Sequence, residues 1–436
     1  MTTPPTNRRG FIKNAALGIL GAGAAIKTNA EVPSSTESPA IRRYRTMGRT
    51  GFKVSDFGSG SPSSEAVLKV LFERGVNVVD TGEQYGNGNN ERLIASVMKE
   101  FDRSNIFINC KLYEEKEFKS KEDVIARTCA ALERLETDYV DCLMIHSAES
   151  SKIIKDKAFH AGMKQLKKEG KVRSLGVSCH GNNHLVDPKE SLDTILLTAV
   201  NDGRFDVIQL AYNFFNRDKA EKVLEACERG NIGTQIIKSN PVQLFMMMDE
   251  RVNQARADGK EPNEYTLQFY EKFKKMTDEG RKFFADYNLK SDRELMDAAM
   301  KFVLDNDQAH TVLWAFSNFQ DIETMLALSG NSLNQKGLGL LEGYRQKLGH
   351  YNCRIGCNVC QEACPHHLPV NEIMRYNYYY SVKGRQKDAM EKFASLPGKK
   401  PHEVCGSCPG YCETACPYNV ETRTLLAMAE GNLSFI

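Results

Sequence analysis

Eight cysteines near the end of the chain are the residues best suited to chemistry by their type and spacing. They form two runs, and each run closes with Cys-Pro. Two groups of four thiolates match the ligand requirement of two [4Fe–4S] clusters. Because such clusters carry electrons, the pattern predicts an electron-carrying region. The expected ligands are Cys353, Cys357, Cys360 and Cys364 in the first run and Cys405, Cys408, Cys412 and Cys416 in the second.

Two other chemistries could use eight cysteines. An exported protein could join them in four disulfides, and two zinc ions could each take four. A disulfide scaffold has no reason to repeat one compact run, and zinc sites more often use two separated C-x2-C pairs, so we favour clusters. In bacterial two-cluster ferredoxins the last cysteine of each run binds the other cluster. That rule would place Cys416 with the first run and Cys364 with the second. One gap in each run is a residue longer than usual, which leaves the pairing open.

The start of the chain has the features of a targeting peptide. Arg8 and Arg9 precede Gly-Phe-Ile-Lys, and an apolar run extends from Ala15 to Ile26. This run is too short to span a bilayer, and the paired arginines resemble a twin-arginine signal. We expect residues 1–30 to be a signal peptide read by the twin-arginine translocase and residues 31–40 to be a Pro/Ser-rich linker. The folded protein would then be periplasmic, with its clusters acquired before export.

The composition is that of an ordinary globular protein. The 436 residues are 41% hydrophobic and 26% charged, with a formal net charge of +2. A near-neutral chain has no electrostatic basis for binding nucleic acid. No apolar stretch after the signal is long enough to cross a membrane, so an integral membrane protein is not expected. Residues 41–350 suffice for one large α/β domain, which leaves residues 351–436 as a small cysteine-bearing domain.

The large domain alternates β-branched apolar runs with amphipathic segments. Eight strands, each followed by a helical pattern, predict an α/β fold of the (β/α)8 barrel type. We expect the small domain to be mainly α-helical and ferredoxin-like. Residues 242–290 interrupt the alternation of strands and helices, and we expect them to be a charged helical insertion after the seventh strand. The strands are expected at Ser55–Ser59, Asn77–Asp80, Asn105–Lys111, Tyr139–His146, Val172–Ser178, Val207–Tyr212, Gly233–Lys238 and Thr311–Ala315.

Four polar residues stand at or just after successive strand ends, where barrels carry their catalytic groups. Asp80 ends the second strand and Tyr85 follows it, while Lys111 and His146 end the third and fourth. Each alone could be a capping, surface or core residue. All four at successive strand ends form a candidate catalytic set that is hard to dismiss.

At these residues the chain resembles the aldo-keto reductase family, from about Tyr44 to Ser329. The similar segments are residues 44–55 (YRTMGRTGFKVS), 75–86 (GVNVVDTGEQYG), 170–178 (GKVRSLGVS) and 205–213 (FDVIQLAYN). The resemblance implies a (β/α)8 fold and a catalytic tetrad, which Asp80, Tyr85, Lys111 and His146 match position by position. It also implies that Tyr85 acts as the general acid toward a carbonyl oxygen, with its pKa lowered by the Lys111 ammonium. In the same way it implies that hydride comes from NADP or NAD and that His146 orients the carbonyl oxygen.

The positions for a nicotinamide cofactor match the family less well. Ser178 and Gln209 fall where the family binds the nicotinamide amide. Lys238 and Ser239 stand where a Tyr-Ser segment is usual, and a lysine there resembles the iron–sulfur-bearing branch. Phe316 and Ser317 replace a Gly-containing phosphate loop, with no Lys or Arg nearby. The sequence therefore leaves open whether NADP, NAD or neither is bound.

The combined expectation is an exported enzyme, an oxidoreductase that interconverts a small carbonyl compound and its alcohol while two [4Fe–4S] clusters relay electrons. A redox partner protein would fit this arrangement. The alternative is a non-catalytic or electron-transfer iron–sulfur protein whose barrel serves as a binding module. The substrate, the direction of reaction and the oligomeric state do not follow from the sequence.

Overall fold

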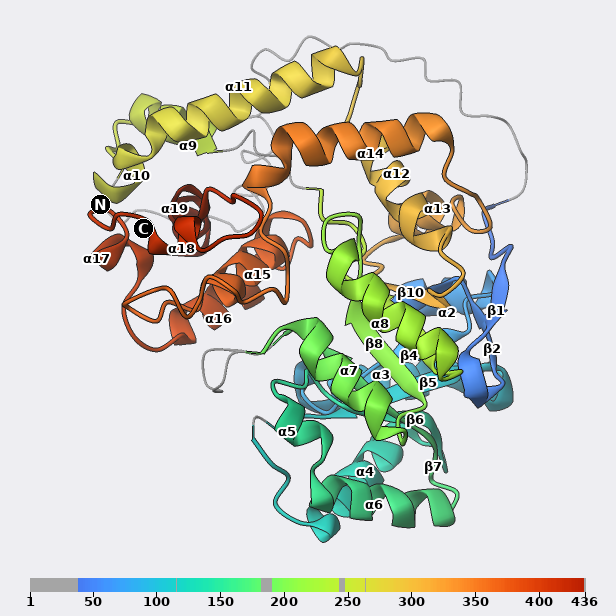
Figure 1. The fold of residues 1–436 in the computed structure, drawn as a ribbon. Helices are drawn as coiled ribbons and strands as arrows, with labels where there is room; N and C mark the ends of the chain where they lie inside the picture. The colour runs from blue at the N-terminus through green and yellow to red at the C-terminus, as the bar shows by residue number, and fades with distance from the viewer. Residues whose placement is uncertain (1–37, 115, 182–189, 243–247, 263, 435–436) are drawn as a thin grey trace, which may run out of the picture. The chain divides into compact units, whose positions relative to one another are not determined.

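A computed structural model describes residues 38–114, 116–181, 190–242, 248–262 and 264–434 (Figure 1). The predicted signal peptide and most of the predicted linker lie outside the described residues. Residues Pro39–Ile436 form one compact unit. In the described part of the chain, no helix combines the length and apolar character needed to cross a membrane.

Eight parallel strands close into a barrel in the order β10, β3, β4, β5, β6, β7, β8, β9. The closing pair joins β10 to β3, with Val312 opposite Phe57. All eight predicted strands are confirmed, each within two residues of the expected bounds. The strands are β3 (Phe57–Gly60), β4 (Val78–Asp80), β5 (Phe107–Leu112), β6 (Val140–Ile145), β7 (Val172–Cys179), β8 (Val207–Ala211), β9 (Gly233–Ile237) and β10 (Thr311–Trp314).

Helices follow the strands because apolar residues recur on one face and, in several of them, a polar side chain caps the first turn. In α4 (Lys121–Leu135), Ser120 accepts a hydrogen bond from Asp123 N at 3.1 Å, which satisfies one free donor of the first turn. The other barrel helices are α2 (Glu65–Glu73), α3 (Asn89–Met98), α5 (Ser151–Ile154), α6 (Lys157–Lys168), α7 (Leu192–Asp202), α8 (Arg217–Arg229), α12 (Arg293–Leu304), α13 (Phe319–Leu326) and α14 (Gln335–Leu348).

A short antiparallel hairpin of β1 (Tyr44–Thr46) and β2 (Lys53–Ser55) precedes the barrel. Its buried Met47 packs on Gly233, the first residue of β9, so closely that a Cβ at Gly233 would lie only 2.4 Å from Met47 Cγ. The hairpin therefore covers the amino-terminal ends of the strands. This leaves their carboxyl ends as the face on which polar side chains can gather.

The segment after β9 is helical, as predicted for residues 242–290. It contains α9 (Met248–Ala257), α10 (Glu264–Gln268) and α11 (Tyr270–Asp286). Thr277 of α11 donates a hydrogen bond to Asp249 of α9 at 2.9 Å. Tyr265 and Phe269 belong to the same hydrophobic core as Leu425 and other residues of the cysteine region. The insertion is thus tied to the cysteine-bearing end of the chain.

The cysteine region is helical, and it packs on the barrel. Its helices are α15 (Val370–Ser381), α16 (Gln386–Ser395), α17 (Pro401–Val404), α18 (Tyr411–Thr414) and α19 (Thr422–Leu433). Tyr378 Oη donates to the carbonyl oxygen of Asn240 at 3.0 Å. Leu192 N, at the start of α7, donates to the carbonyl oxygen of Gly356 at 3.0 Å. The first cysteine run is therefore fastened to the barrel through backbone atoms.

Candidate functional site

The four predicted tetrad residues meet at the carboxyl ends of the strands. Asp80 is the last residue of β4, and Lys111 is the second-last residue of β5. Tyr85 begins the 3₁₀ turn η2 (Tyr85–Gly88), and His146 directly follows β6. Because parallel strands point their carboxyl ends to one face of a barrel, residues far apart in sequence converge there.

Lys111 is the centre of the group. Its fully buried ammonium lies 2.5 Å from Asp80 Oδ2. It also donates to the carbonyl oxygen of Thr81 at 3.1 Å and to Tyr85 Oη at 3.4 Å. Tyr85 Oη lies in turn 3.3 Å from His146 Nε2. One connected set of contacts thus runs from the carboxylate through the ammonium and the phenol to the imidazole.

The electrostatics correct one expectation from the sequence. Burial raises the pKa of the Tyr85 phenol, and the charge of Lys111 lowers it by less, so the net shift is upward. Burial disfavours the Lys111 ammonium, but Asp80 and Tyr85 outweigh it, and the pKa of Lys111 is raised. The prediction that Lys111 depresses the pKa of Tyr85 is therefore wrong for the net shift, because desolvation of the phenolate dominates. Tyr85 is a protonated acid at neutral pH.

His146 is neutral at physiological pH. Burial, followed by the charges of Lys111 and Lys392, holds its pKa well below the usual value. Its Nδ1 is buried and has no hydrogen-bond partner among the described residues. A neutral imidazole next to the tyrosine hydroxyl can orient a carbonyl oxygen without competing for the proton.

These shifts predict the pH dependence of carbonyl reduction. With Tyr85 as the predicted proton donor and His146 as the predicted orienting group, reduction would require Tyr85 protonated and His146 neutral. Because the pKa of Tyr85 is raised and that of His146 is lowered, we expect kcat/KM to be flat between about pH 6.5 and 9. The measurement is a pH profile for reduction of 4-nitrobenzaldehyde, with NADPH and reduced methyl viologen as alternative donors. A decline centred at pH 7 to 8 would identify a different proton donor.

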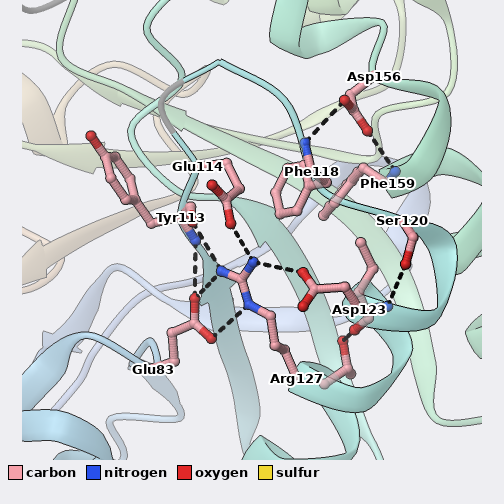
Figure 2. A network of polar contacts seen from close by, with 11 residues as sticks. Glu83, Tyr113, Glu114, Phe118, Ser120, Asp123, Arg127, Asp156 and Phe159 are labelled. Atoms are coloured by element: carbon pink, nitrogen blue, oxygen red, sulfur yellow. Dashed lines mark hydrogen bonds and ion pairs between the residues drawn. The ribbon is translucent and has the colours of Figure 1, made fainter. Parts of the chain in front are cut away.

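An arginine outside the tetrad holds the loop that carries Tyr85. Figure 2 shows Arg127 of α4 among three carboxylates. Its guanidinium forms a two-pronged pair with Glu83, with Nε 3.1 Å from Glu83 Oε2. The same group contacts Glu114 at 2.6 Å and Asp123 at 3.2 Å. Bidentate geometry of this kind fixes both the position and the orientation of the Glu83 carboxylate.

The network also reaches the loop that follows Lys111. Arg127 donates to the carbonyl oxygen of Tyr113 at 2.9 Å, and Tyr113 N donates to Glu83 at 3.3 Å. Glu83 lies two residues before Tyr85, and Tyr113 lies two residues after Lys111. Arg127 therefore braces the loops on both sides of the Tyr85–Lys111 contact. Sequence reasoning missed it, although it stands on the buried stripe of α4, three residues after Val124 and four before Ala131.

The positions expected to hold a nicotinamide ring are buried beside the tetrad. Gln209 donates to Asp80 Oδ1 at 3.0 Å, and Ser178 Oγ accepts from Ser147 N at 2.7 Å. Ser239 is 1% exposed, and its hydroxyl has no partner among the described residues. These three side chains fit the amide end of a nicotinamide.

The positions expected to hold the phosphates fit less well. Phe316 is buried. Ser317 donates from both its backbone N and its hydroxyl to Asp321, at 2.8 and 2.5 Å. An acidic side chain thus occupies donors at the start of α13 that a phosphate would otherwise use. Lys238 has a positive φ of 55° and faces Tyr379 of the cysteine region.

The eight cysteines fall into two electrostatic groups. Burial raises the pKa of the Cys353 thiol well above its usual value, and three neighbouring thiols raise it further. These neighbours are Cys357, Cys360 and Cys416. In the second group, burial first and neighbouring thiols next raise the pKa of Cys405 to about 12. Its neighbours are Cys364, Cys408 and Cys412, which line one pocket together with it. Each group joins three cysteines of one run to the last cysteine of the other.

The two groups adjoin each other and are surrounded by hydrogen-bond donors. The charge of Cys412 is the largest thiol influence on Cys360, which belongs to the other group. Asn371 Nδ2 lies 3.6 Å from Cys353 Sγ, and Val420 N lies 3.5 Å from Cys416 Sγ. Across the described ranges, no three His, Cys, Asp or Glu side chains form a group that could hold a single metal ion.

Comparison with known proteins places the barrel among reductases. The model of the aldo/keto reductase family matches residues 51–344. The aldo-keto reductase YhdN of Bacillus subtilis is 22% identical over 317 residues, which cover 67% of this chain and 90% of that protein. A probable aldo-keto reductase of Glycine max is 26% identical over 208 residues, covering 43% of this chain and 56% of the relative.

Solved structures resemble the chain over the same part. A holo form of an aldo-keto reductase from Bacillus halodurans has 18% identity and a TM-score of 0.49, and it covers 69% of this chain and 95% of that one. An aldo-keto reductase from Klebsiella pneumoniae in complex with NADPH has 17% identity and a TM-score of 0.47, with coverage of 70% and 95%. Because the family model spans more than half of its length, this chain is an oxidoreductase that belongs to the aldo/keto reductase family.

Proposed function

We propose that this chain is an exported oxidoreductase that interconverts a small carbonyl compound and its alcohol, with two [4Fe–4S] clusters that exchange electrons with the barrel site. One observation carries the catalytic part of the proposal. Lys111 Nζ contacts both Asp80 and Tyr85, and the Tyr85 hydroxyl contacts His146, at the end of the barrel where catalysis occurs.

In this proposal the chain's own residues transfer the proton and orient the substrate. Tyr85 donates its proton to the carbonyl oxygen during reduction and recovers it from the alcohol during oxidation. Lys111 stabilises the resulting phenolate, and Asp80 holds Lys111 in place. His146, neutral and 3.3 Å from the same hydroxyl, orients the substrate oxygen.

A nicotinamide nucleotide, when bound, would supply hydride to the carbonyl carbon. Ser178, Gln209 and Ser239 would hold its ring end, since all three are buried and two of them adjoin residues of the tetrad loops. The loop after β10 offers no cation for its phosphates, and Asp321 occupies the donors of Ser317. We therefore leave NADP and NAD as equal candidates, with a tightly held nucleotide favoured outside the cytoplasm.

The cysteine groups support the cluster part of the proposal. Cys353, Cys357, Cys360 and Cys416 would bind one [4Fe–4S] cluster, and Cys364, Cys405, Cys408 and Cys412 the other. The proximity of Cys360 to Cys412 suits electron transfer between them. A four-iron cluster differs from a zinc site because its thiolates bind four separate iron atoms and stand farther apart than around one ion. Export of a folded protein through the twin-arginine translocase would deliver it with both clusters in place.

Anaerobic purification from the periplasmic fraction tests the proposal directly. We expect about eight iron atoms per chain and seek nicotinamide nucleotide released by acid. Stoichiometric nucleotide would mean that the barrel carries its own hydride source. Its absence in protein with full iron content would favour direct electron transfer from the clusters. Protein that contains little iron, or that is recovered only from the cytoplasm, would contradict the cluster or the export part.

A further inference from the structure

Five cations gather where α15 and the segment after it pack on the barrel's mouth. We call them the cationic cluster, and they surround the adjacent rings of Tyr378 and Tyr379. Lys238 Nζ is 4.4 Å from the centre of the Tyr379 ring, and Lys392 Nζ is 5.8 Å from it. Lys383 Nζ is 3.6 Å from the centre of the Trp314 ring at the end of β10. The cluster consists of Lys238, Arg375, Lys383, Arg385 and Lys392.

Carboxylates balance only part of this charge. Arg375 pairs with Glu372 at 3.3 Å, while Arg385 and Lys392 share Asp388 at 3.0 and 2.6 Å. Lys238 and Lys383 form no ion pair with a carboxylate in the part of the chain that the structure describes. Both lie near the same ring, since Lys238 Nζ is 6.0 Å and Lys383 Nζ 5.8 Å from the centre of the Tyr378 ring.

Lys238 and Lys383 are each half-buried, and their ammonium groups are desolvated enough to repel each other. Burial, followed by the charge of Lys238, lowers the pKa of Lys383 to about 7. Burial likewise lowers the pKa of Lys238, although Tyr379 opposes the shift. Two ammonium groups in one partly desolvated space are unfavourable unless an anion joins them.

The cationic cluster also adjoins the tetrad. The charge of Lys392 contributes to the lowered pKa of His146, and the charge of Tyr379 contributes to the raised pKa of Tyr85. The Ser239 hydroxyl, next in the chain after Lys238, is buried without a described partner. Beside the tetrad, the structure thus holds a buried hydroxyl without a described partner and two lysines that pair with no carboxylate among the described residues. Tyr379 interacts with one of them, Lys238.

We propose that Lys238 of the barrel and Lys383 of the cysteine region form an oxyanion site beside the tetrad, which binds a phosphate or carboxylate group. The proposal rests on the proposed function for the identity of the neighbouring catalytic site. The oxyanion could belong to a nucleotide or to the substrate, because both would place an anionic group beyond the reacting carbon. In either case the site is incomplete without the cysteine region.

Binding to the full-length, iron-loaded protein tests the site without turnover. Pyrophosphate, NADPH and malonate serve as probes in isothermal titration calorimetry. We expect Lys238→Met and Lys383→Met each to weaken the same probe about tenfold, since each removes one charge-assisted contact. The matched control is Lys336→Met, which removes an exposed lysine on α14. Weakening of pyrophosphate and NADPH would assign the site to a nucleotide, and weakening of malonate to a substrate carboxylate.

Two further readouts separate binding from a structural role. An anion raises the pKa of Lys383, so binding at pH 8 should take up a proton, seen as a buffer-dependent heat that Lys383→Met removes. The titratable and charged groups near Lys383 are Lys238 after β9, Asp321 of α13, Arg385 and Tyr378 of α15. The lysine variants should also keep their iron content and unfold no earlier than wild type.

Wild-type protein that binds none of the probes, or lysine variants that bind them all as wild type does, would overturn the proposal. Loss of turnover in a Tyr85 variant that still binds the anionic probes would bear on the catalytic role of the tetrad and would leave the oxyanion site unaffected. The two hypotheses therefore fail independently.

Discussion

Replacement of Tyr85 with phenylalanine is expected to lower kcat for carbonyl reduction by about 10²–10⁴-fold, the usual contribution of a general acid. The substitution removes only the hydroxyl that lies 3.4 Å from Lys111 Nζ and 3.3 Å from His146 Nε2. The Asp80–Lys111 pair stays intact, so the buried ammonium keeps its counter-ion and the fold should be preserved. Because the proton is transferred in the transition state, kcat and kcat/KM should fall together.

The measurement is single-turnover and steady-state reduction of 4-nitrobenzaldehyde by the iron-loaded enzyme. Tyr139→Phe provides the matched control, since Tyr139 precedes β6 at the end opposite His146 and its ring packs against Arg103 and Arg173. We expect this control to react like wild type. Full activity of the Tyr85 variant would assign the proton to another group and would favour the non-catalytic interpretation of the barrel.

Replacement of Cys405 and Cys408 with serine is expected to halve the iron content, from about eight to about four atoms per chain. Both residues line the cavity shared with Cys364 and Cys412, so the second cluster would lose two of its four ligands. If the clusters relay electrons, turnover with reduced methyl viologen should also be abolished. Iron analysis and electron paramagnetic resonance measure the first effect, and viologen oxidation measures the second.

Cys129→Ser is the control for this pair, because Cys129 lies on α4 and outside both cysteine groups. Its iron content and turnover should equal those of wild type. An unchanged iron content in the double variant would refute the ligand assignment. A halved iron content with undiminished turnover would agree with the ligand assignment but would refute the transfer of electrons through the clusters.

The convergence of the candidate tetrad residues could be predicted because it follows from topology. Once eight strands are recognised, Asp80, Lys111 and His146 must share one face, since parallel strands in a barrel end together. The direction of the Tyr85 pKa could not be predicted in the same way. Sequence identifies the neighbouring lysine, but the competing desolvation depends on how the loops and the cysteine region cover the phenol.

The cationic cluster could not be predicted from sequence patterns. Lys238 and Lys383 are separated by more than a hundred residues and belong to different regions, and no periodicity relates them. Tyr378 and Tyr379 belong to an aromatic run, residues 376–380, whose composition does not indicate cations as its neighbours. In the structure it brings cations to the barrel's mouth, which is a consequence of tertiary docking. The assignment of the cysteines to two groups is an intermediate case. The unusual spacing within the two runs left the pairing open, and it stays a prediction that the charges of neighbouring thiols support.

The Arg127 network has a consequence for how this enzyme could be altered. One guanidinium fastens the loops beside Tyr85 and Lys111, so replacing Arg127 on the outer helix α4 is expected to shift both candidate catalytic residues together. Loop positions that look independent in a sequence are therefore linked. A directed-evolution library confined to the rim of the barrel would not include Arg127. Selection for new substrates would accordingly be expected to recover compensating changes on α4, far from the substrate itself.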